Sequence, residues 1–286
     1  MSTVYLNGDF MPLEEARISP LDRGFTFGDG VYEVIPVYNR RIFRLHEHLL
    51  RLERSLKLIH MHNPLTAPEW EAIFKRLISD NKGDDQSIYL QVTRGVSARD
   101  HLFTTDLMPT VFVMTKPLLQ ADNRVGVGAI VREDIRWQWC HIKAITLLPG
   151  VLLRYEAYMS DAKEAILIRD GQVTEGAASN VFICHDNHIL TPPKSERLLP
   201  GITRDLVIDL LREEGMDCDE VTVSEKDLYA ADEIWITSST QEIVPVTRLD
   251  GRPVGEGVPG PLWQRATRAY RKFKNDFCAG KIQDPA

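Results

Sequence analysis

The sequence predicts an α+β protein of two domains. In the N-terminal part, strand-like segments stand before and after two amphipathic helical segments, an order typical of α+β units. The C-terminal part is richer in short strand segments separated by turn signals, which favours an antiparallel, barrel-like sheet with helices around it. A chain of 286 residues accommodates two such domains. We expect a small N-terminal domain at residues 1–117, a linker at 118–124 and a larger domain at 125–286.

Composition and charge exclude several classes of function. Hydrophobic residues make up 43% of the chain and charged residues 26%, which is ordinary for a globular protein. The net charge is −7 and no basic run is present, so we expect no nucleic-acid partner. No apolar run approaches the roughly 18 residues of a membrane span, and the N-terminus lacks the features of a signal peptide. We therefore expect a cytoplasmic protein without membrane contact.

Cysteine and histidine spacing does not indicate a metal site. The four cysteines are scattered, without the C-x-x-C spacing of zinc sites or the pattern of a disulfide framework. His46 and His48 stand two positions apart, but no carboxylate or cysteine partner is evident. We interpret this pair as a solvated helix start and expect no metal.

The N-terminal domain is predicted from residue patterns. Asn7-Gly8 is a hairpin turn within residues 4–10. Residues 23–30 are predicted as a glycine-bearing loop that leads into a strand at 31–38. One amphipathic helix follows from apolar residues spaced by four and three: Leu45, Leu49, Leu52, Leu56 and Ile59. A capping box at Thr66 and Glu69 opens a second helix that runs to about residue 80, and strands follow at 88–93 and 111–115.

The larger domain is predicted as hairpins interleaved with helices. The expected turns are Asp170-Gly171, Asp186-Asn187 and Asp250-Gly251. The expected strands are 165–168, 172–173, 181–184, 188–191, 234–237 and 243–247. The expected helices are 149–162, 203–214 and 262–277.

Lys143 is the first candidate for catalysis. It stands among Ile142, Ala144 and Ile145. An ammonium group there cannot stay dry and unpaired without large cost. Either its pKa falls or the nitrogen enters a covalent bond, and both outcomes suit a Schiff-base lysine. Considered alone, a strand-end lysine that reaches solvent is the more common case.

Three further stretches could bind a ligand. Glu175 follows a predicted hairpin strand and stands among small residues. Gly201, Ile202 and Thr203 open a helix, whose free N–H groups form a ready anion site. Residues 237–240 place hydroxyl groups after a strand, where they could complete a phosphate site. Each stretch also has an ordinary interpretation: a turn glutamate, a helix cap and a polar turn.

The order of these residues is more specific than any one of them. Arg51, Lys143, Glu175, the stretch 201–203 and the pair Ser239-Thr240 resemble the pattern of fold-type IV pyridoxal-phosphate enzymes. The resemblance covers nearly the whole chain. Within that class, residues 23–34 and 91–101 look most like the D-amino acid aminotransferases. The implied reaction is transamination between a D-amino acid, such as D-alanine or D-glutamate, and a 2-oxo acid.

The resemblance implies a role for each site residue. Lys143 would carry pyridoxal 5′-phosphate covalently and move the substrate proton, and Glu175 would keep the pyridine nitrogen protonated. Leu199 would pack on the cofactor ring. The phosphate ligands would be Arg51, Ile202, Thr203, Ser239 and Thr240. The substrate carboxylate would be bound by Tyr32, Arg99 and His101.

The resemblance also implies a homodimer with shared active sites, in which the Arg99 and His101 loop reaches over from the neighbouring subunit. One departure from the pattern is Pro36, which stands where relatives often have a lysine. Three alternatives share the fold: a branched-chain L-amino acid aminotransferase, an (R)-selective amine transaminase and an aminodeoxychorismate lyase. A non-catalytic binding protein is the alternative from another class. The pair Arg99 and His101 favours the D-amino acid interpretation because it would bind the substrate carboxylate, and an intact Lys143 and Glu175 speak against the binding protein.

Overall fold

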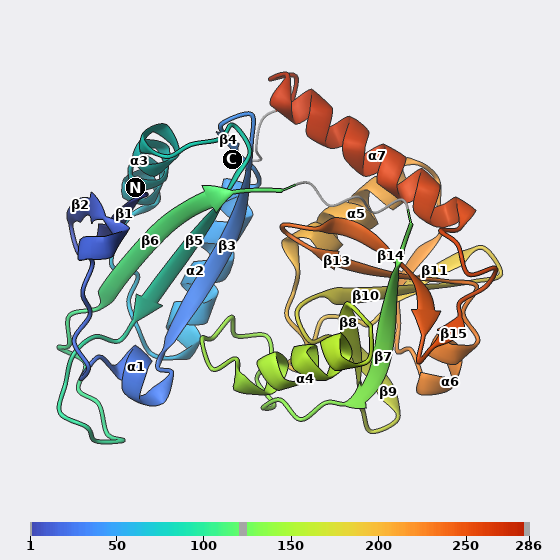
Figure 1. Cartoon of the computed structure of the whole chain (residues 1–286), viewed down its shortest axis with the longest axis horizontal. Coiled ribbons are helices and arrows are strands. Elements are labelled where there is room, and N and C mark those ends of the chain that lie inside the picture. The colour runs from blue at the N-terminus through green and yellow to red at the C-terminus, as the bar shows by residue number, and fades with distance from the viewer. Residues whose placement is uncertain (1, 120–124, 283–286) are drawn as a thin grey trace. The chain divides into compact units, whose positions relative to one another are not determined.

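The computed structural model describes residues 2–119 and 125–282, which divide into two units (Figure 1). The N-terminal unit contains residues 2–119 together with Ile142–Thr146. The C-terminal unit contains residues 125–141 and 147–282. Ile142–Thr146, which carries Lys143, therefore packs with the N-terminal unit although both flanking stretches belong to the other. Residues 120–124 of the predicted linker lie outside the described residues.

An antiparallel sheet forms the N-terminal unit, with strand order β2-β1-β6-β5-β3-β4. Its strands are β1 (Thr3–Leu6), β2 (Asp9–Pro12), β3 (Gly30–Tyr38), β4 (Arg41–Ile42), β5 (Gln86–Thr93) and β6 (Thr110–Pro117). A short 3₁₀ turn, η1 (Leu13–Glu15), follows β2. Helices α2 (Leu45–Leu58) and α3 (Ala67–Asp80) lie along one face of the sheet (Figure 1).

Both helices form as their sequence patterns predict. The leucine stripe of α2 and the apolar stripe of α3 pack with strand residues in one core, so tertiary packing supports the amphipathic pattern. At the start of α3, Thr66 donates its backbone N–H to Glu69 Oε2 at 2.7 Å, which completes the predicted capping box.

The loop expected at residues 23–30 contains a short helix, α1 (Arg23–Phe27), so that part of the prediction is wrong. Asp22 caps the helix by accepting a hydrogen bond from the Gly24 N–H at 2.7 Å. Gly28 ends it at a φ of 66°, the left-handed conformation that glycine adopts without strain. In the sequence alone, a glycine that ends a short helix cannot be distinguished from a glycine in a loop. The glycines of this stretch therefore suggested a loop.

Strand β3 continues through Pro36. Pro36 pairs with Ser87 of β5, and its carbonyl accepts a hydrogen bond from the Phe43 N–H at 2.9 Å. At its other end, Val31 of β3 forms a bridge with Ala144, so the segment Ile142–Thr146 lies beside the start of β3. The strand that carries Tyr32 and Glu33 is thus directly adjacent to Lys143.

The C-terminal unit contains a mixed sheet in the order β12-β11-β10-β13-β14-β7-β8-β9, with β15 paired to β14. Its strands are β7 (Val127–Glu133), β8 (Glu164–Arg169), β9 (Gln172–Gly176), β10 (Asn180–His185), β11 (His188–Thr191), β12 (Cys218–Glu220), β13 (Glu233–Ser238), β14 (Glu242–Leu249) and β15 (Arg252–Pro253). The expected sheet was antiparallel. Instead β7 runs parallel to β14 and β8, and β12 runs parallel to β11.

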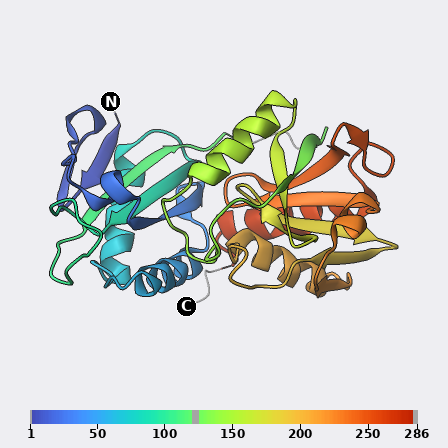
Figure 2. The same cartoon turned by 90° about the horizontal axis from the view of Figure 1, so that it is seen from below.

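The predicted turns of this unit are present, and residues with positive φ occupy them: Asp170, Gly171, Asp186, Asn187, Asp250 and Gly251. The helices are α4 (Leu148–Met159), α5 (Ile202–Glu213), α6 (Glu225–Tyr229) and α7 (Pro261–Cys278). Helix α4 packs on β7 and β8 (Figures 1 and 2). Among the described residues, no helix has both the length and the apolar character needed to cross a membrane.

Candidate active site

The backbone of Lys143 is held from two sides within the N-terminal unit. Its carbonyl accepts a hydrogen bond from the Tyr32 N–H of β3 at 3.0 Å. Its N–H donates to Ser55 Oγ of α2 at 3.2 Å. Two different elements therefore fix the position from which the Lys143 side chain extends.

The ammonium group of Lys143 lies over an aromatic ring. Nζ is 4.3 Å from the centroid of the Tyr32 ring, a distance typical of a cation–π contact. No carboxylate among the described residues forms an ion pair with this nitrogen. The amine of Lys143 thus lies against an aromatic ring and is not engaged by a carboxylate of the described residues.

A buried ionic cluster lies one strand position beyond Tyr32. Glu33 is fully buried and accepts hydrogen bonds from Arg51 Nε and Nη2, both at 2.8 Å. Its Oε2 also lies 2.8 Å from His48 Nδ1. Burial alone would raise the pKa of Glu33, but Arg51 and His48 together lower it well below its usual range.

This cluster corrects one expectation and adds to another. His48 is only 1% exposed, so the predicted solvated helix start is wrong for this residue. Burial lowers the pKa of His48; Glu33 opposes that effect, and Arg51 and Lys143 add to it. Arg51 is fixed by a two-point ion pair with Glu33, which orients its guanidinium group. Its assignment to the phosphate stays a prediction.

Arg99 and His101 lie on one exposed loop between β5 and β6. Arg99 Cζ is 5.2 Å from the centroid of the Phe27 ring, and the His101 ring centroid is 5.4 Å from the same ring. Phe27 belongs to α1, so that helix supports both side chains. Two of the three predicted carboxylate ligands, Arg99 and His101, are thus brought together on one aromatic surface.

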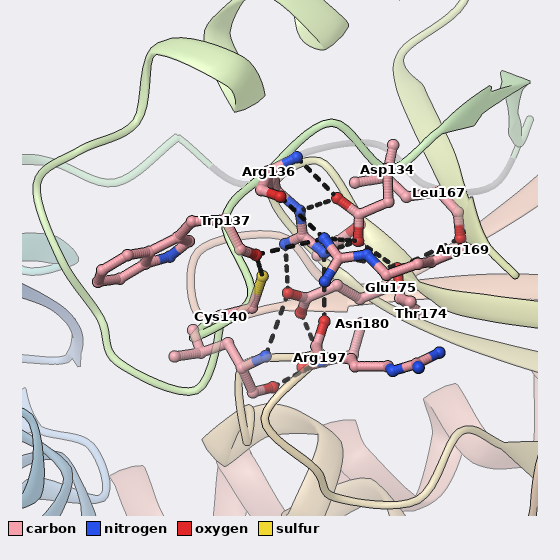
Figure 3. A network of polar contacts seen from close by, with 12 residues as sticks. Asp134, Arg136, Trp137, Cys140, Leu167, Arg169, Thr174, Glu175, Asn180 and Arg197 are labelled. Atoms are coloured by element: carbon pink, nitrogen blue, oxygen red, sulfur yellow. Dashed lines mark hydrogen bonds and ion pairs between the residues drawn. The ribbon is translucent and has the colours of Figure 1, made fainter.

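Glu175 stands in β9 of the C-terminal unit, at the centre of a polar network (Figure 3). Its Oε1 accepts hydrogen bonds from Arg136 Nη1 and from the Leu199 N–H, the latter at 3.1 Å. Its Oε2 accepts one from Asn180 Nδ2 at 3.2 Å. With 4% of its surface exposed, Glu175 is held in a single orientation by three donors.

Arg136 is itself fixed by a second carboxylate. Its Nε and Nη2 donate to the two oxygens of Asp134, both at 2.9 Å (Figure 3). Asp134 also accepts from Thr174 Oγ1 at 2.9 Å and pairs with Arg169 at 3.1 Å. The bidentate pair leaves Arg136 Nη1 directed at Glu175.

Burial raises the pKa of Glu175 to about 7, although the Arg136 guanidinium and the Leu199 N–H act in the opposite direction. A carboxyl group with a pKa near neutrality can share a proton with a ring nitrogen more evenly than an ordinary glutamate. The environment of Glu175 therefore suits proton control at a heterocycle.

Asn180 joins Glu175 to the start of α5. Its Nδ2 donates to the Leu199 carbonyl at 2.8 Å as well as to Glu175. Its Oδ1 lies so near Gly201 that a Cβ atom there would collide with it. Gly201 is the N-cap of α5, and the first N–H groups of the helix belong to Ile202 and Thr203. The predicted anion site and Glu175 thus belong to one assembly.

The hydroxyl cluster lies on a strand of the same sheet. Thr237 of β13 pairs with Asn180 of β10, and α5 packs against β13. Thr237 Oγ1 is buried and has no hydrogen-bond partner among the described residues. Ser239 and Thr240 follow in the turn between β13 and β14. An unsatisfied buried hydroxyl next to this turn is the kind of group that a bound ligand completes.

Sequence reasoning missed three residues of this network: Asp134, Arg136 and Asn180. Asp134 and Arg136 follow β7, which the sequence did not predict as a strand, so their charges were not read as a strand-end pair. Asn180 lies five residues after Glu175. The available signal in the sequence was the amide side chain of Asn180 at the start of a buried strand.

Comparison with known proteins identifies the family. The sequence model described as amino-transferase class IV matches residues 30–249. A D-alanine aminotransferase of Bacillus licheniformis is 42% identical over 270 residues, which covers 94% of this chain and 95% of that protein. A D-alanine aminotransferase of Staphylococcus haemolyticus is 36% identical over 278 residues, covering 96% and 98%.

Solved structures agree. The branched-chain amino acid aminotransferase from Escherichia coli superposes with a TM-score of 0.88 at 27% identity, covering 99% of this chain and 96% of that one. The branched-chain aminotransferase from Thermoproteus uzoniensis, solved with norvaline, has a TM-score of 0.87 at 29% identity, with the same coverage. These matches confirm the α+β, fold-type IV architecture that the resemblance implied. The chain belongs to the class IV amino-transferase family.

Proposed function

We propose that this protein is a pyridoxal-phosphate-dependent aminotransferase that exchanges the amino group between a D-amino acid, such as D-alanine or D-glutamate, and a 2-oxo acid. The observation that carries the proposal is its full-length similarity to two D-alanine aminotransferases, at 42% and 36% identity. The polar networks around Lys143 and Glu175 support it, because each fixes a group that transamination needs.

The residues of the C-terminal unit fit the cofactor. The first turn of α5 supplies the N–H groups of Ile202 and Thr203 to a phosphate, at the positive end of the helix dipole. Ser239 and Thr240 would add hydroxyl groups, and the orphaned Thr237 Oγ1 beside them fits a site that a ligand completes. We also assign Arg51 to the cofactor phosphate, as the resemblance implies.

Other residues would contact the pyridine ring of the cofactor. The backbone of Leu199 is fixed through its N–H to Glu175 and its carbonyl to Asn180, and we assign the Leu199 side chain to packing on the cofactor ring. When bound, the pyridine ring of pyridoxal phosphate withdraws the electrons that the substrate Cα keeps after losing its proton. Glu175 holds the proton on the ring nitrogen that this withdrawal requires.

Lys143 moves the reacting proton. Its Nζ would carry the proton between the substrate Cα and the C4′ atom of the bound cofactor. The hydrogen bonds from Tyr32 and to Ser55 keep the Lys143 backbone still during this transfer. Fixed geometry of this kind lowers the entropy cost of proton transfer.

Arg99, His101 and Tyr32 bind the substrate carboxylate. A guanidinium group and an imidazole on the Phe27 surface offer charge-assisted donors to a planar anion. A carboxylate held at one spot fixes which face of Cα meets Lys143. This arrangement selects one enantiomer and favours amino acids over simple amines.

A homodimer is part of the proposal. Helix α4 buries Leu153 and Ala157 on one face. Its other face exposes six apolar or aromatic side chains, each at least 49% exposed in the single chain: Leu148, Val151, Leu152, Tyr155, Tyr158 and Met159. Their spacing of three and four residues forms one continuous stripe, and such a stripe marks a protein contact. A second copy of the chain would cover it.

We also propose a cytoplasmic location. The four cysteines are free thiols in the structure, and a reducing compartment keeps thiols in that state.

A panel of half-reactions tests the proposed activity. The purified yellow protein is mixed with single D- and L-amino acids, and the loss of cofactor absorbance is followed over time. D-Alanine and D-glutamate should bleach the absorbance fastest. Branched-chain L-amino acids are the second candidate, because branched-chain aminotransferases share the fold at 27% identity. Faster bleaching by L-leucine would replace the D-specific proposal with that one.

A further inference from the structure

We propose that Asp29 is a positioning residue for substrate recognition: through Arg23 and Arg94 it holds the loop that carries Arg99 and His101. The inference deepens the proposed function and rests on it, because it takes these two residues as the ligands of the substrate carboxylate. Asp29 itself would not touch the substrate.

Asp29 joins two guanidinium groups. Its Oδ2 accepts hydrogen bonds from Arg23 Nε and from Arg94 Nε, both at 2.8 Å. Its Oδ1 accepts a third from Arg94 Nη2 at 2.9 Å. The side chains of Arg23 and Arg94 are only 4% and 7% exposed, so Asp29 is the counter-ion that two nearly buried cations share.

Arg23 forms hydrogen bonds to the loop of residues 95–103 both near its centre and at its start. Its Nη1 donates to the Asp100 carbonyl at 2.6 Å, and its Nη2 to the His101 carbonyl at 3.4 Å. Its backbone N–H donates to the Gly95 carbonyl at 2.8 Å. Asp100 lies between Arg99 and His101 in the chain. Fixing these two carbonyl groups therefore sets the direction in which both side chains leave the backbone.

Arg94 holds the other side of the loop. Its Nη2 donates to the Ile59 carbonyl at 2.7 Å, at the end of α2. Its guanidinium carbon lies 3.6 Å from the centroid of the Phe103 ring, a close cation–π contact. Asp29 thus ties both ends of residues 94–103 to one carboxylate, whose negative charge attracts both arginines.

The charge is essential to this arrangement. An asparagine at position 29 would keep the size of the side chain, but it would leave two nearly buried guanidinium groups without a counter-ion. The loop would then sample other positions, and Arg99 would meet the substrate carboxylate in the right place only part of the time. The affinity for amino acids would therefore fall, while the rate of the chemical step would change little.

The test compares Asp29→Asn with Asp84→Asn. Asp84 also pairs with an arginine of the N-terminal unit, Arg40, at 3.5 Å, but these side chains are 73% and 43% exposed, and Asp84 precedes β5, at the end of that strand opposite the loop. Kinetics with D-alanine are measured for the holoenzyme, both variants, Arg99→Ala and the double variant Asp29→Asn/Arg99→Ala. Hydrogen exchange of residues 95–103 is measured without substrate.

We expect Asp29→Asn to raise the KM for D-alanine by about tenfold with little change in kcat. Exchange of residues 95–103 should become faster, and Asp84→Asn should change neither quantity. In the Arg99→Ala background, Asp29→Asn should reduce kcat/KM by a clearly smaller factor than in the wild type, because only the part of its effect that passes through His101 remains. Asp29→Glu keeps the negative charge, so it should raise the KM less than Asp29→Asn does.

Two results would overturn the inference: unchanged exchange of residues 95–103, or an equal loss of kcat/KM with and without Arg99. Arg23→Lys serves if Asp29→Asn fails to fold. A lysine can pair with Asp29 but cannot also reach both loop carbonyls, so it should loosen the loop in the same way. If the wild-type enzyme does not react with D-amino acids, the proposed function is refuted and the inference on Asp29 is not. Exchange of the loop would still decide whether Asp29 anchors it.

Discussion

The Oδ1 atom of Asn180 occupies the space where a side chain at position 201 would begin, so Asn180 and Gly201 form a matched pair. The other end of the same amide donates to Glu175 and to the Leu199 carbonyl. One side chain therefore couples the carboxylate of the site to the entry of α5. The two ends of a bound cofactor, ring nitrogen and phosphate, would be positioned by the same residue.

Replacement of Gly201 by alanine tests this coupling. The new methyl group must push Asn180 away, and overpacking of this kind costs about 1–3 kcal/mol. We expect a lower melting temperature and a cofactor Kd raised roughly tenfold, since about 1.4 kcal/mol corresponds to a factor of ten. The double variant Asn180→Ala/Gly201→Ala removes the collision, so its loss of stability should be smaller than the sum of the two single losses. Additive losses in the double variant would show that the two residues do not interact.

The raised pKa of Glu175 predicts a pH-dependent stability. A carboxyl group whose folded pKa is about 7, above its ordinary 4.5, contributes stability that is complete below the unfolded pKa and is lost as the pH rises through the folded one. Glutamine at this position does not titrate. The melting temperature of cofactor-free wild type, relative to Glu175→Gln, should therefore fall between about pH 5 and about pH 8. The full effect is roughly 3 kcal/mol at most, at about 1.4 kcal/mol per pKa unit.

The same variant should lose activity. Glutamine keeps a hydrogen bond but cannot hold the ring nitrogen protonated, so the half-reaction with D-alanine should slow by about 10²–10⁴. A pH-independent difference in melting temperature would contradict the shifted pKa. An unchanged half-reaction rate would separately show that Glu175 is not at the ring.

The sequence was sufficient for most elements because their signals are local. The spacing of leucines in α2, the capping box at Thr66 and the turn Asp170-Gly171 each specify structure within a few residues. Strand β7 was missed because Gly128 and Ala129 interrupt its β-branched residues, and its stability comes from parallel neighbours on both sides. Parallel pairing joins distant segments and leaves no turn signal between them.

The candidate site also contains residues that the sequence predicts and residues that it does not. The order of Lys143, Glu175 and the α5 entry could be read from the sequence, because their residue types follow the pattern of the family along the chain. The partners that set their chemistry were not. Arg136 meets Glu175 across 39 positions of sequence, and Arg51 meets Glu33 across 18. Only the folded sheet brings these charges together, and their effect on a pKa depends on burial that composition does not reveal.

Lys143 should carry the cofactor. Borohydride reduction of the yellow protein followed by peptide mapping should place the pyridoxyl group on Lys143, which has no ion-pair partner among the described residues to occupy its amine. Lys143→Ala should lose transamination and can retain cofactor through the phosphate ligands. Label on another lysine would contradict the assignment.

Mixing of inactive variants tests the shared site. Lys143→Ala and Arg99→Ala are combined under conditions that allow subunit exchange. Hybrid dimers then contain one site with both wild-type residues, so activity should return to about a quarter of the wild-type value for random pairing. Lys143→Ala mixed with Glu175→Gln is the matched control: if both residues serve the site of one chain, no hybrid site is complete. Absence of recovery in the first mixture, despite measured exchange, would mean that each site is built from one chain.

Substrate choice should depend on Arg99. Proton transfer needs the Cα–H bond directed at Lys143 and perpendicular to the cofactor ring. With the carboxylate held at Arg99 and His101, only one enantiomer presents its hydrogen to Lys143. A site built to bind a carboxylate also rejects substrates that lack it, because its charged donors are then left without a partner.

Arg99→Ala should therefore reduce kcat/KM for D-alanine and D-glutamate far more than for an amine such as (R)-1-phenylethylamine. The loss of one charge-assisted contact, about 1.5–3 kcal/mol, corresponds to about ten- to a hundredfold. The ratio of D- to L-alanine rates should fall as well, because the carboxylate is no longer held at one spot. His101→Ala should act in the same direction, since both side chains pack on Phe27 and approach the same anion. If D-alanine and the amine lose equally, Arg99 supports the loop rather than the substrate, and the carboxylate must be bound elsewhere.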